Sequence, residues 1–375
     1  MEGIDSSYCT NTFSQDGCGK GILDMLRQGI VLPAHPLALD SNRKLDERRQ
    51  RALSRYYLAS GVGGLAIGVH TTQFQIHNPK VGLLEPVWAL AGEEMDRADG
   101  SQSQPLVRVA GICGDTRQAI SETTLARDLG YHLGLLNLNA LAGRSIDQLI
   151  DHCRAVSGSI NIFGFYLQAA AGGVPLPHSF WRRFCEIENV RAIKIAAFNR
   201  YQTIDVVRAV IESGRDDIAI YTGNDDNIVL DLLTPYRFTV GDKLVERRIV
   251  GGLLGHWAVW TSKAADLLKQ CHELARDSYQ SSNGRDVPLD MLRLNLAVTD
   301  CNAALFDVAN GFSGCIPGIH EVLRRQGLLE GIWCLDENEV LSQGQSAELD
   351  RVEAAYPDLL DNEFVAENRD DWLKG

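Results

Sequence analysis

One lysine in this sequence lies where a solvated charge would be out of place. Lysine is scarce, with eight residues against 28 arginines, and Lys194 lies within the apolar run Val-Arg-Ala-Ile-Lys-Ile-Ala-Ala at 190–197. Burial is costly for an ammonium group and lowers its pKa. An amine with a lowered pKa is the nucleophile that Schiff-base chemistry requires. The alternative is that Lys194 ends its strand and extends its charge into solvent.

A tyrosine ends a second apolar run. Tyr166 closes the segment Ser-Ile-Asn-Ile-Phe-Gly-Phe-Tyr at 159–166, the run that precedes that of Lys194. A phenol at the end of a strand beside an amine can carry protons to and from a carbinolamine. It can equally close a core with its hydroxyl in water, so this residue alone leaves both roles open.

Two short loops after other apolar runs hold residues that could bind a small anion. Backbone N–H groups and hydroxyls in such loops can hold a carboxylate, and a glycine lets a ligand come close to the backbone. Ordinary turns have the same composition, so each loop on its own is a weak signal. The residues are Gly68, His70, Thr71 and Thr72 in the first loop, and Gly223, Asn224 and Asp225 in the second.

Eight apolar runs, with amphipathic segments between them, must position these side chains. Nearly continuous apolar strands are typical of a parallel sheet that is covered on both faces. Eight alternating units predict an α/β fold, the TIM (β/α)8 barrel, in which the ends of the strands share one mouth. An open doubly wound sheet is the alternative, but no Gly-x-Gly-x-x-Gly follows the first run. The runs are 29–35, 63–69, 105–112, 132–138, 159–166, 190–197, 217–223 and 247–255.

The chain continues past the predicted barrel. Strand signals stop near residue 280, and the segments 287–309, 319–328 and 346–356 have helical patterns. The polar stretch 92–105, which contains Gly and Ser, is expected to be an exposed loop. We therefore predict an N-terminal extension at 1–27, a (β/α)8 barrel at 28–280 and a C-terminal helical region at 281–375.

Composition restricts the classes of partner. The 375 residues are 45% hydrophobic and 23% charged, and the formal net charge of −13 argues against binding to nucleic acid or to an anionic membrane surface. No signal peptide is recognisable at the N-terminus, and no apolar run approaches the ~20 residues of a membrane span. Nine scattered cysteines without a Cys-x-x-Cys pair suit a reducing compartment. We therefore expect a cytoplasmic protein with a small-molecule partner.

Taken together, the motifs resemble the dihydrodipicolinate synthase/N-acetylneuraminate lyase family of class I aldolase-like barrels. The resemblance spans roughly residues 28–330 and rests on the order and spacing of the motifs. The matching motifs are Ala34-His35-Pro36 after the first run, the loop with two threonines after the second, Tyr166, Ile193-Lys194 with the lysine 28 residues after that tyrosine, and Gly223-Asn224-Asp225 after the seventh run.

The resemblance implies a mechanism and an assembly. Lys194 would form a Schiff base with pyruvate or another 2-oxo acid, and Tyr166 would relay protons with help from Thr71 or Thr72. N–H groups of the first loop would hold the substrate carboxylate. The protonated imine accepts electrons during C–C bond cleavage or formation, so neither a metal nor an organic cofactor is implied. Members of the family are usually oligomers, which implies a homo-oligomer, a dimer or a tetramer.

Departures from the family pattern indicate a divergent member and argue against dihydrodipicolinate synthesis itself. The family's Gly-Thr-Thr-Gly-Glu loop is Gly-Val-His-Thr-Thr-Gln at 68–73. This leaves the alignment of the threonines open and brings His70 near the mouth as an extra acid/base, a substrate contact or a structural residue. The arginine that binds a substrate carboxylate in the synthases is Ala171, which cannot do so. The long loop before the eighth run offers replacement cations, unless they are solvated at the surface: Arg237, Lys243, Arg247 and Arg248.

Two other functions stay open. A metal-dependent barrel enzyme could take its ligands from His35, His70, His77 and Asp115, which lie near predicted strand ends, although no His-x-His or His-Glu-x-x-His pattern occurs. A small-molecule-binding protein of the same family that has lost turnover is consistent with the altered threonine loop and with Ala171.

Overall fold

Eight parallel strands form a closed barrel. The computed structural model describes residues 19–100, 104–280 and 286–374 of the chain. Its barrel strands follow the order β1-β10-β7-β6-β5-β4-β3-β2, and a parallel bridge between Ala34 and Ala66 joins the two ends of the sheet. The predicted (β/α)8 barrel is therefore confirmed. The strands are β1 (Val31–Pro33), β2 (Gly64–Ile67), β3 (Val107–Ile112), β4 (Leu133–Leu136), β5 (Asn161–Leu167), β6 (Val190–Ala196), β7 (Ala219–Thr222) and β10 (Gly251–Leu254).

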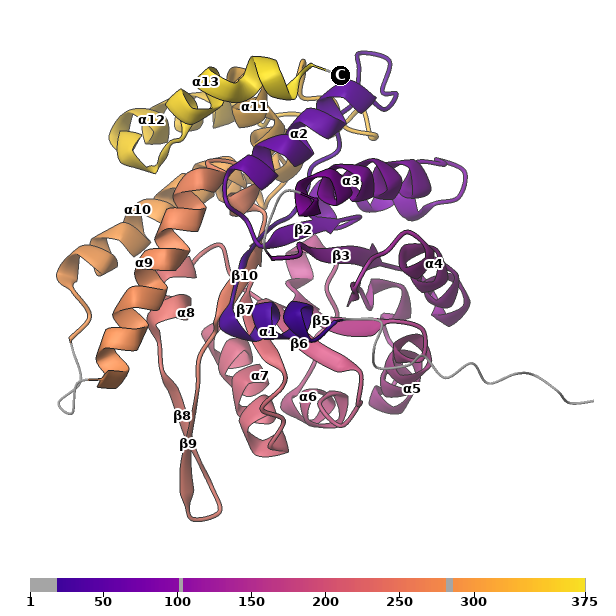
Figure 1. The fold of residues 1–375 in the computed structure, drawn as a ribbon, viewed down its shortest axis with the longest axis vertical. Coiled ribbons are helices and arrows are strands. Elements are labelled where there is room, and N and C mark those ends of the chain that lie inside the picture. The colour runs from indigo at the N-terminus through magenta and orange to yellow at the C-terminus, as the bar shows by residue number, and fades with distance from the viewer. Residues whose placement is uncertain (1–18, 101–103, 281–285, 375) are drawn as a thin grey trace, which may run out of the picture.

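A ring of helices covers the outside of the barrel (Figure 1). Asp46 and Asp115 cap the helices that follow them, because each carboxylate accepts a hydrogen bond from the backbone N–H three residues later. One helix runs on to Asp99, so the expectation that 92–105 is a loop is wrong for 92–99. The helices are α2 (Glu47–Ala59), α3 (Leu84–Asp99), α4 (Thr116–Asp128), α5 (Ile146–Ser157), α6 (His178–Phe184), α7 (Arg200–Ser213), α8 (Ile228–Leu233) and α9 (Thr261–Gln280).

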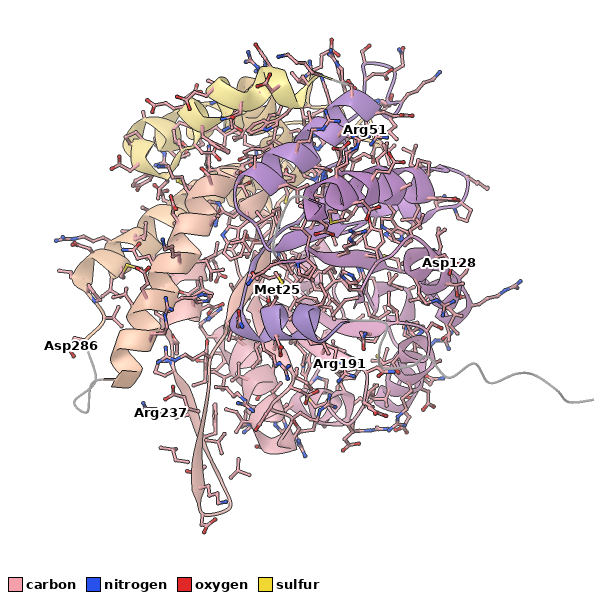
Figure 2. The ribbon with its side chains drawn as sticks, viewed as in Figure 1. Met25, Arg51, Asp128, Arg191, Arg237 and Asp286 are labelled. Atoms are coloured by element: carbon pink, nitrogen blue, oxygen red, sulfur yellow. The ribbon has the colours of Figure 1, made fainter. Side chains whose placement is uncertain are left out.

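A short helix, α1 (Lys20–Gln28), closes the N-terminal end of the barrel. Its Ile22 and Leu26 are buried in the cluster that fills the barrel interior. The Tyr221 hydroxyl of β7 donates to the backbone oxygen of Leu26 at 2.9 Å, which fixes the helix to a strand. Figure 2 labels Met25 on this helix, across the end of the barrel. The part of the predicted N-terminal extension before residue 19 lies outside the described residues.

The C-terminal region is helical, as predicted from its pattern. Its helices are α10 (Leu289–Leu305), α11 (Cys315–Arg325), α12 (Gln345–Ala355) and α13 (Asn362–Trp372). Of these helices, α10 packs against α8 of the barrel, and α13 lies beside α2 (Figure 1). Asp361 joins the two parts, because its carboxylate accepts hydrogen bonds from the Tyr56 hydroxyl at 2.8 Å and from the Ser262 backbone at 3.2 Å. Among the described helices, none has the length and apolar character needed to cross a membrane.

An antiparallel hairpin precedes the eighth barrel strand, where the sequence suggested only a long loop. It consists of β8 (Tyr236–Val240) and β9 (Lys243–Arg247) and projects from the body of the protein (Figure 1). Arg237 lies on this hairpin (Figure 2), where it pairs with Glu246 at 2.7 Å. Arg247 pairs with Asp216. Of the four cations proposed to replace the missing arginine, none lines the cavity described below; they are Arg237, Lys243, Arg247 and Arg248.

Candidate active site

Lys194 is a buried amine that faces the interior of the barrel. Along β6, alternation turns Ala192, Lys194 and Ala196 inward, so small residues flank the lysine on its own strand. The side chain is only 7% exposed, and its Nζ lies 4.6 Å from the centre of the Phe165 ring. Among the described residues, no hydrogen-bond acceptor or ion-pair partner contacts this amine. The sequence-based expectation of a buried lysine at the mouth of the barrel agrees with this geometry.

The electrostatics of Lys194 involve Asp225. Burial lowers the pKa of Lys194 below its usual range, and the charge of Asp225 opposes part of that shift. Burial likewise raises the pKa of Asp225, which is 9% exposed, while the charge of Lys194 acts in the opposite direction. The protonation of each group therefore depends on the charge of the other.

A cavity of about 300 Å³ surrounds the Lys194 amine. Its inner wall comes from barrel strands and the loops at their C-terminal ends, where active sites of this architecture lie. Ala171 is part of this wall, so the position where the synthases carry an arginine is apolar here. The remaining wall comes from the C-terminal region and consists of Phe306, Gly311, Phe312, Ser313, Cys315 and Glu339.

The two threonines of the first loop lie in different places. Thr71 lines the cavity, and its hydroxyl donates to the Ala34 backbone oxygen at 2.7 Å. Thr72 does not line the cavity. Its hydroxyl donates to the backbone oxygen of His35 at 2.6 Å and accepts a hydrogen bond from the Gly68 N–H at 3.0 Å. Thr72 and Gly68 therefore hold the loop in shape. Thr71 lies in the cavity wall, but its hydroxyl proton is already engaged by the backbone.

His70 also lines the cavity, half-buried and close to Lys194. Burial, together with the nearby charge of Lys194, lowers the pKa of His70 to about 4, so the ring is neutral at pH 7. Within the described residues, the backbone N–H groups of His70 and Thr71 donate no hydrogen bond. Two free N–H groups beside a buried amine form a site that suits a carboxylate.

Tyr166 lies outside the cavity, so its predicted position beside the amine is wrong. Its side chain points from β5 toward the outer helices and packs on Trp181 of α6 with ring centres 5.3 Å apart. The hydroxyl accepts a hydrogen bond from the backbone N–H of Leu176 at 3.3 Å. In the strand register, Phe165 rather than Tyr166 is paired with Lys194 and points inward. The alternation of a strand puts adjacent side chains on opposite faces, which separates Tyr166 from the amine.

The second loop contributes two of its three predicted residues to the cavity wall. Gly223 and Asp225 line it, and Asn224 lies behind it. The Asn224 side chain donates to an Asp231 carboxylate oxygen at 2.9 Å and accepts from the Phe198 N–H at 3.0 Å, so it fixes the loop rather than contacting a ligand. A β-carbon on residue 223 would lie 2.5 Å from the Lys194 Cε. Gly223 therefore makes room for the aliphatic part of the Lys194 side chain, and not for a ligand as the sequence suggested.

Two of the three histidines proposed as metal ligands, His35 and His77, are engaged outside the cavity. His35 is fully buried, with its ring 2.9 Å from the Ser54 hydroxyl and 2.8 Å from the Pro36 backbone oxygen. His77 donates to Glu122 at 3.0 Å and to the backbone oxygen of Gly68 at 2.7 Å. Within the ranges that the structure describes, no three His, Cys, Asp or Glu side chains form a group that could hold a metal ion.

The cavity residues that the sequence analysis missed include Phe165, Phe198, Phe312 and Glu339. Phe165 carries no local signal, because its strand is apolar throughout and only the register of β5 against β6 pairs it with the lysine. Phe198 directly follows the sixth apolar run, but a lone phenylalanine carries no motif. Nothing in the local sequence marks Phe312 or Glu339, because only the fold brings the C-terminal region over the mouth of the barrel.

Comparison with known proteins supports the architecture. No family model and no curated protein matches the sequence, whereas many solved structures match the fold. A dihydrodipicolinate synthase from Oceanobacillus iheyensis is 16% identical with a TM-score of 0.68, and the match covers 90% of this chain and 99% of that one. N-acetylneuraminate lyase from Fusobacterium nucleatum complexed with pyruvate is 16% identical with a TM-score of 0.64, over 90% and 98% of the two chains.

A third similar structure is a putative dihydrodipicolinate synthase family protein from Coccidioides immitis, at 13% identity and a TM-score of 0.63, covering 91% of this chain and 97% of that one. Fold and site thus define a (β/α)8 barrel with a lysine in its mouth and a helical C-terminal extension. More narrowly, the chain has the fold of the N-acetylneuraminate lyases and dihydrodipicolinate synthases, as its motifs predicted.

Proposed function

We propose that this protein is a divergent member of the dihydrodipicolinate synthase/N-acetylneuraminate lyase family. In this proposal it is a Schiff-base-forming lyase or aldolase that acts on pyruvate or another 2-oxo acid through Lys194. One observation carries the proposal: a buried amine with a lowered pKa, without an ion-pair partner, faces a ligand-sized cavity in the described structure. The pyruvate named in the F. nucleatum lyase complex supports this choice of substrate class. Ala171 in the wall argues against dihydrodipicolinate synthesis itself, since no arginine of the described residues lines the cavity.

The proposed reaction begins when the neutral Lys194 amine attacks the keto carbon of the substrate. The free N–H groups of His70 and Thr71 hold the substrate carboxylate. Loss of water from the carbinolamine requires a group that gives and takes protons. Because Tyr166 points away, we assign this task to Asp225, whose raised pKa suits it to proton transfer. The resulting imine withdraws electrons from the neighbouring carbon, so the step itself requires neither a metal nor an organic cofactor.

Borohydride trapping tests the proposal. The protein is incubated with pyruvate and with a panel of other 2-oxo acids, reduced with borohydride, and analysed by intact mass and by peptide mapping. We expect a covalent adduct on Lys194 that is absent from Lys194→Ala. Lys80→Ala is the matched control, because Lys80 is exposed and lies outside the cavity. If folded wild-type protein forms no adduct with any 2-oxo acid, the proposal is wrong.

A second candidate function is reversible binding of a 2-oxo acid without further chemistry. Phe165 favours it, because the residue paired in register with Lys194 offers no hydroxyl for proton relay. Exchange of the pyruvate methyl protons in D₂O, followed by NMR, separates the two candidates. An enzyme that forms the enamine exchanges these protons, whereas a binding protein forms the adduct without exchange.

We also propose that the protein works in the cytoplasm as a homo-oligomer, a dimer or a tetramer. An exposed apolar stripe on α10 supports an assembly, since Leu289, Leu292 and Leu296 are 61%, 45% and 68% exposed. Light scattering coupled to gel filtration tests the assembly, and a monomer at micromolar concentration would contradict it.

A further inference from the structure

The outer half of the cavity is aromatic and is completed by the C-terminal region. Phe198 follows β6, whereas Phe306 and Phe312 lie between α10 and α11. The rings of Phe198 and Phe312 pack together with their centres 5.9 Å apart and their planes at 55°. This pair, hereafter the Phe198–Phe312 pair, presents an apolar surface toward the same cavity that holds Lys194.

The backbone that carries this pair is strained. Phe198 has φ 51° and Phe312 has φ 70°, in the left-handed region that non-glycine residues rarely adopt. Hydrogen bonds hold both in place: the Phe198 N–H donates to Asn224 Oδ1 and the Phe312 N–H donates to the Asp307 backbone oxygen, each at 3.0 Å. Asp307 is itself fixed by the Gly314 N–H at 3.0 Å. Such strain persists where surrounding structure enforces it, and ligand clamps are among the sites where it gathers.

The charges of the cavity are unfavourable to a second anion. In the described part of the chain, the charged residues in its wall are Lys194, Asp225 and Glu339, with two carboxylates against one amine. One carboxylate oxygen of Glu339 is buried and accepts no hydrogen bond from the described residues, and the Cys334 thiol interacts with this carboxylate. An unsatisfied buried acceptor calls for a donor, and a ligand can supply it. Among its described residues, the site therefore offers an aromatic apolar surface, an acceptor, and no cation beyond the lysine.

We propose that the second reactant is an aromatic aldehyde with a hydrogen-bond-donating substituent, such as a phenolic hydroxyl, whose ring packs on the Phe198–Phe312 pair and whose donor reaches Glu339. The inference rests on the proposed Schiff-base function. The cavity volume of about 300 Å³ is at the small end of ligand sites and suits a short oxo acid together with a single ring.

The chemical step balances without another reactant. Pyruvate bound to Lys194 loses a methyl proton to form the enamine, and the enamine carbon forms a bond to the aldehyde carbon. The aldehyde oxygen takes up that proton and becomes a hydroxyl. Water then adds to the imine, and its hydrolysis releases a 4-hydroxy-2-oxo acid and regenerates the amine of Lys194.

The test measures condensation of pyruvate with a panel of aldehydes, by chromatography of the oxo-acid product. The panel contains 4-hydroxybenzaldehyde, benzaldehyde, butanal, glyceraldehyde and an aldehyde that carries a carboxylate. We expect 4-hydroxybenzaldehyde to have the highest kcat/KM. In Phe312→Leu, the preference for the aromatic over the alkyl aldehyde should fall by about fivefold to tenfold, the range expected for a lost aromatic contact. In Glu339→Gln, the preference for the hydroxylated over the plain ring should fall.

A matched control and a separate readout make the outcomes distinguishable. Phe364→Leu changes a partly buried phenylalanine of the same C-terminal region that packs on Tyr56 and lies outside the cavity, and it should retain wild-type selectivity. Thermal unfolding verifies that each variant is folded. If the pyruvate adduct forms but the carboxylated, polyhydroxylated or alkyl aldehyde is preferred, the aromatic inference is overturned while the Schiff-base function stands. If no adduct forms, the Schiff-base function itself fails.

Discussion

Replacing Gly223 with alanine tests whether the position of the Lys194 amine controls reactivity. The new β-carbon would lie 2.5 Å from the Lys194 Cε and 2.8 Å from the Ala196 Cβ. Because carbon atoms pack at about 3.5–4.0 Å, the lysine stem must move by about 1 Å. The backbone of residue 223 does not require a left-handed φ, so alanine is compatible with the main chain. A shift of about 1 Å at a reacting group costs roughly 100-fold in rate.

The assay is the rate at which the borohydride-trapped pyruvate adduct forms in Gly223→Ala. We expect a fall of roughly 100-fold, with a stability loss of about 1–3 kcal/mol from overpacking. Gly92→Ala is the control, since its β-carbon would contact only the Leu129 backbone oxygen at 3.8 Å. The double variant Gly223→Ala/Ala196→Gly removes the overlap between the β-carbons of residues 223 and 196. It should restore the free energy of unfolding more than the rate of adduct formation. Adduct formation at the wild-type rate in folded Gly223→Ala would refute the argument.

Three further predictions concern charge and placement. Because the charge of Asp225 raises the pKa of Lys194, Asp225→Asn should move the pH midpoint of adduct formation lower while slowing turnover; an unchanged midpoint would contradict the coupling. Burial lowers the pKa of His77, but contacts with neighbouring groups raise it overall to about 10, above the ~6.5 of an unfolded chain. The contribution of protonated His77 to folding stability is therefore complete below pH ~6.5 and is lost as the pH rises through 10. His77→Gln should thus lower the free energy of unfolding by about 2–3 kcal/mol at pH 6 and by less at pH 10, as measured by urea unfolding. Tyr166→Phe should leave adduct formation unchanged and cost about 1 kcal/mol of stability, because the Leu176 N–H loses its acceptor; a large loss of turnover would restore the relay role.

The eight barrel strands could be predicted because each is a nearly continuous apolar run. Because these runs are apolar throughout, their sequences do not indicate which side chains point into the barrel. A strand buried on both faces has no polar alternation, so β5 gave no sign that Phe165, and not Tyr166, faces the lysine. Tyr166 lies 28 residues before Lys194, which matches the family pattern, yet it is one position past the strand residue that faces the lysine. Only the strand register resolves such a shift.

Other misses have different causes. The hairpin carries a readable signal, since Tyr236, Phe238 and Val240 alternate with polar residues and a Gly-Asp turn follows, yet its length and charge suggested a loop. The outer cavity wall has no local signal at all. Phe198 and Phe312 meet across more than a hundred residues of chain, and that contact depends on how the C-terminal helices pack on the barrel.

The helix that closes the N-terminal end of the barrel has a kinetic consequence. With Leu26 of α1 seated in the barrel and held by Tyr221, the described structure closes one end of the barrel, and the cavity around Lys194 lies at the other end beside the aromatic wall. For the proposed condensation, the oxo acid must load first, and an aldehyde bound early blocks its path. Initial-rate kinetics should therefore follow a compulsory order, with inhibition at high aldehyde concentration that excess pyruvate relieves.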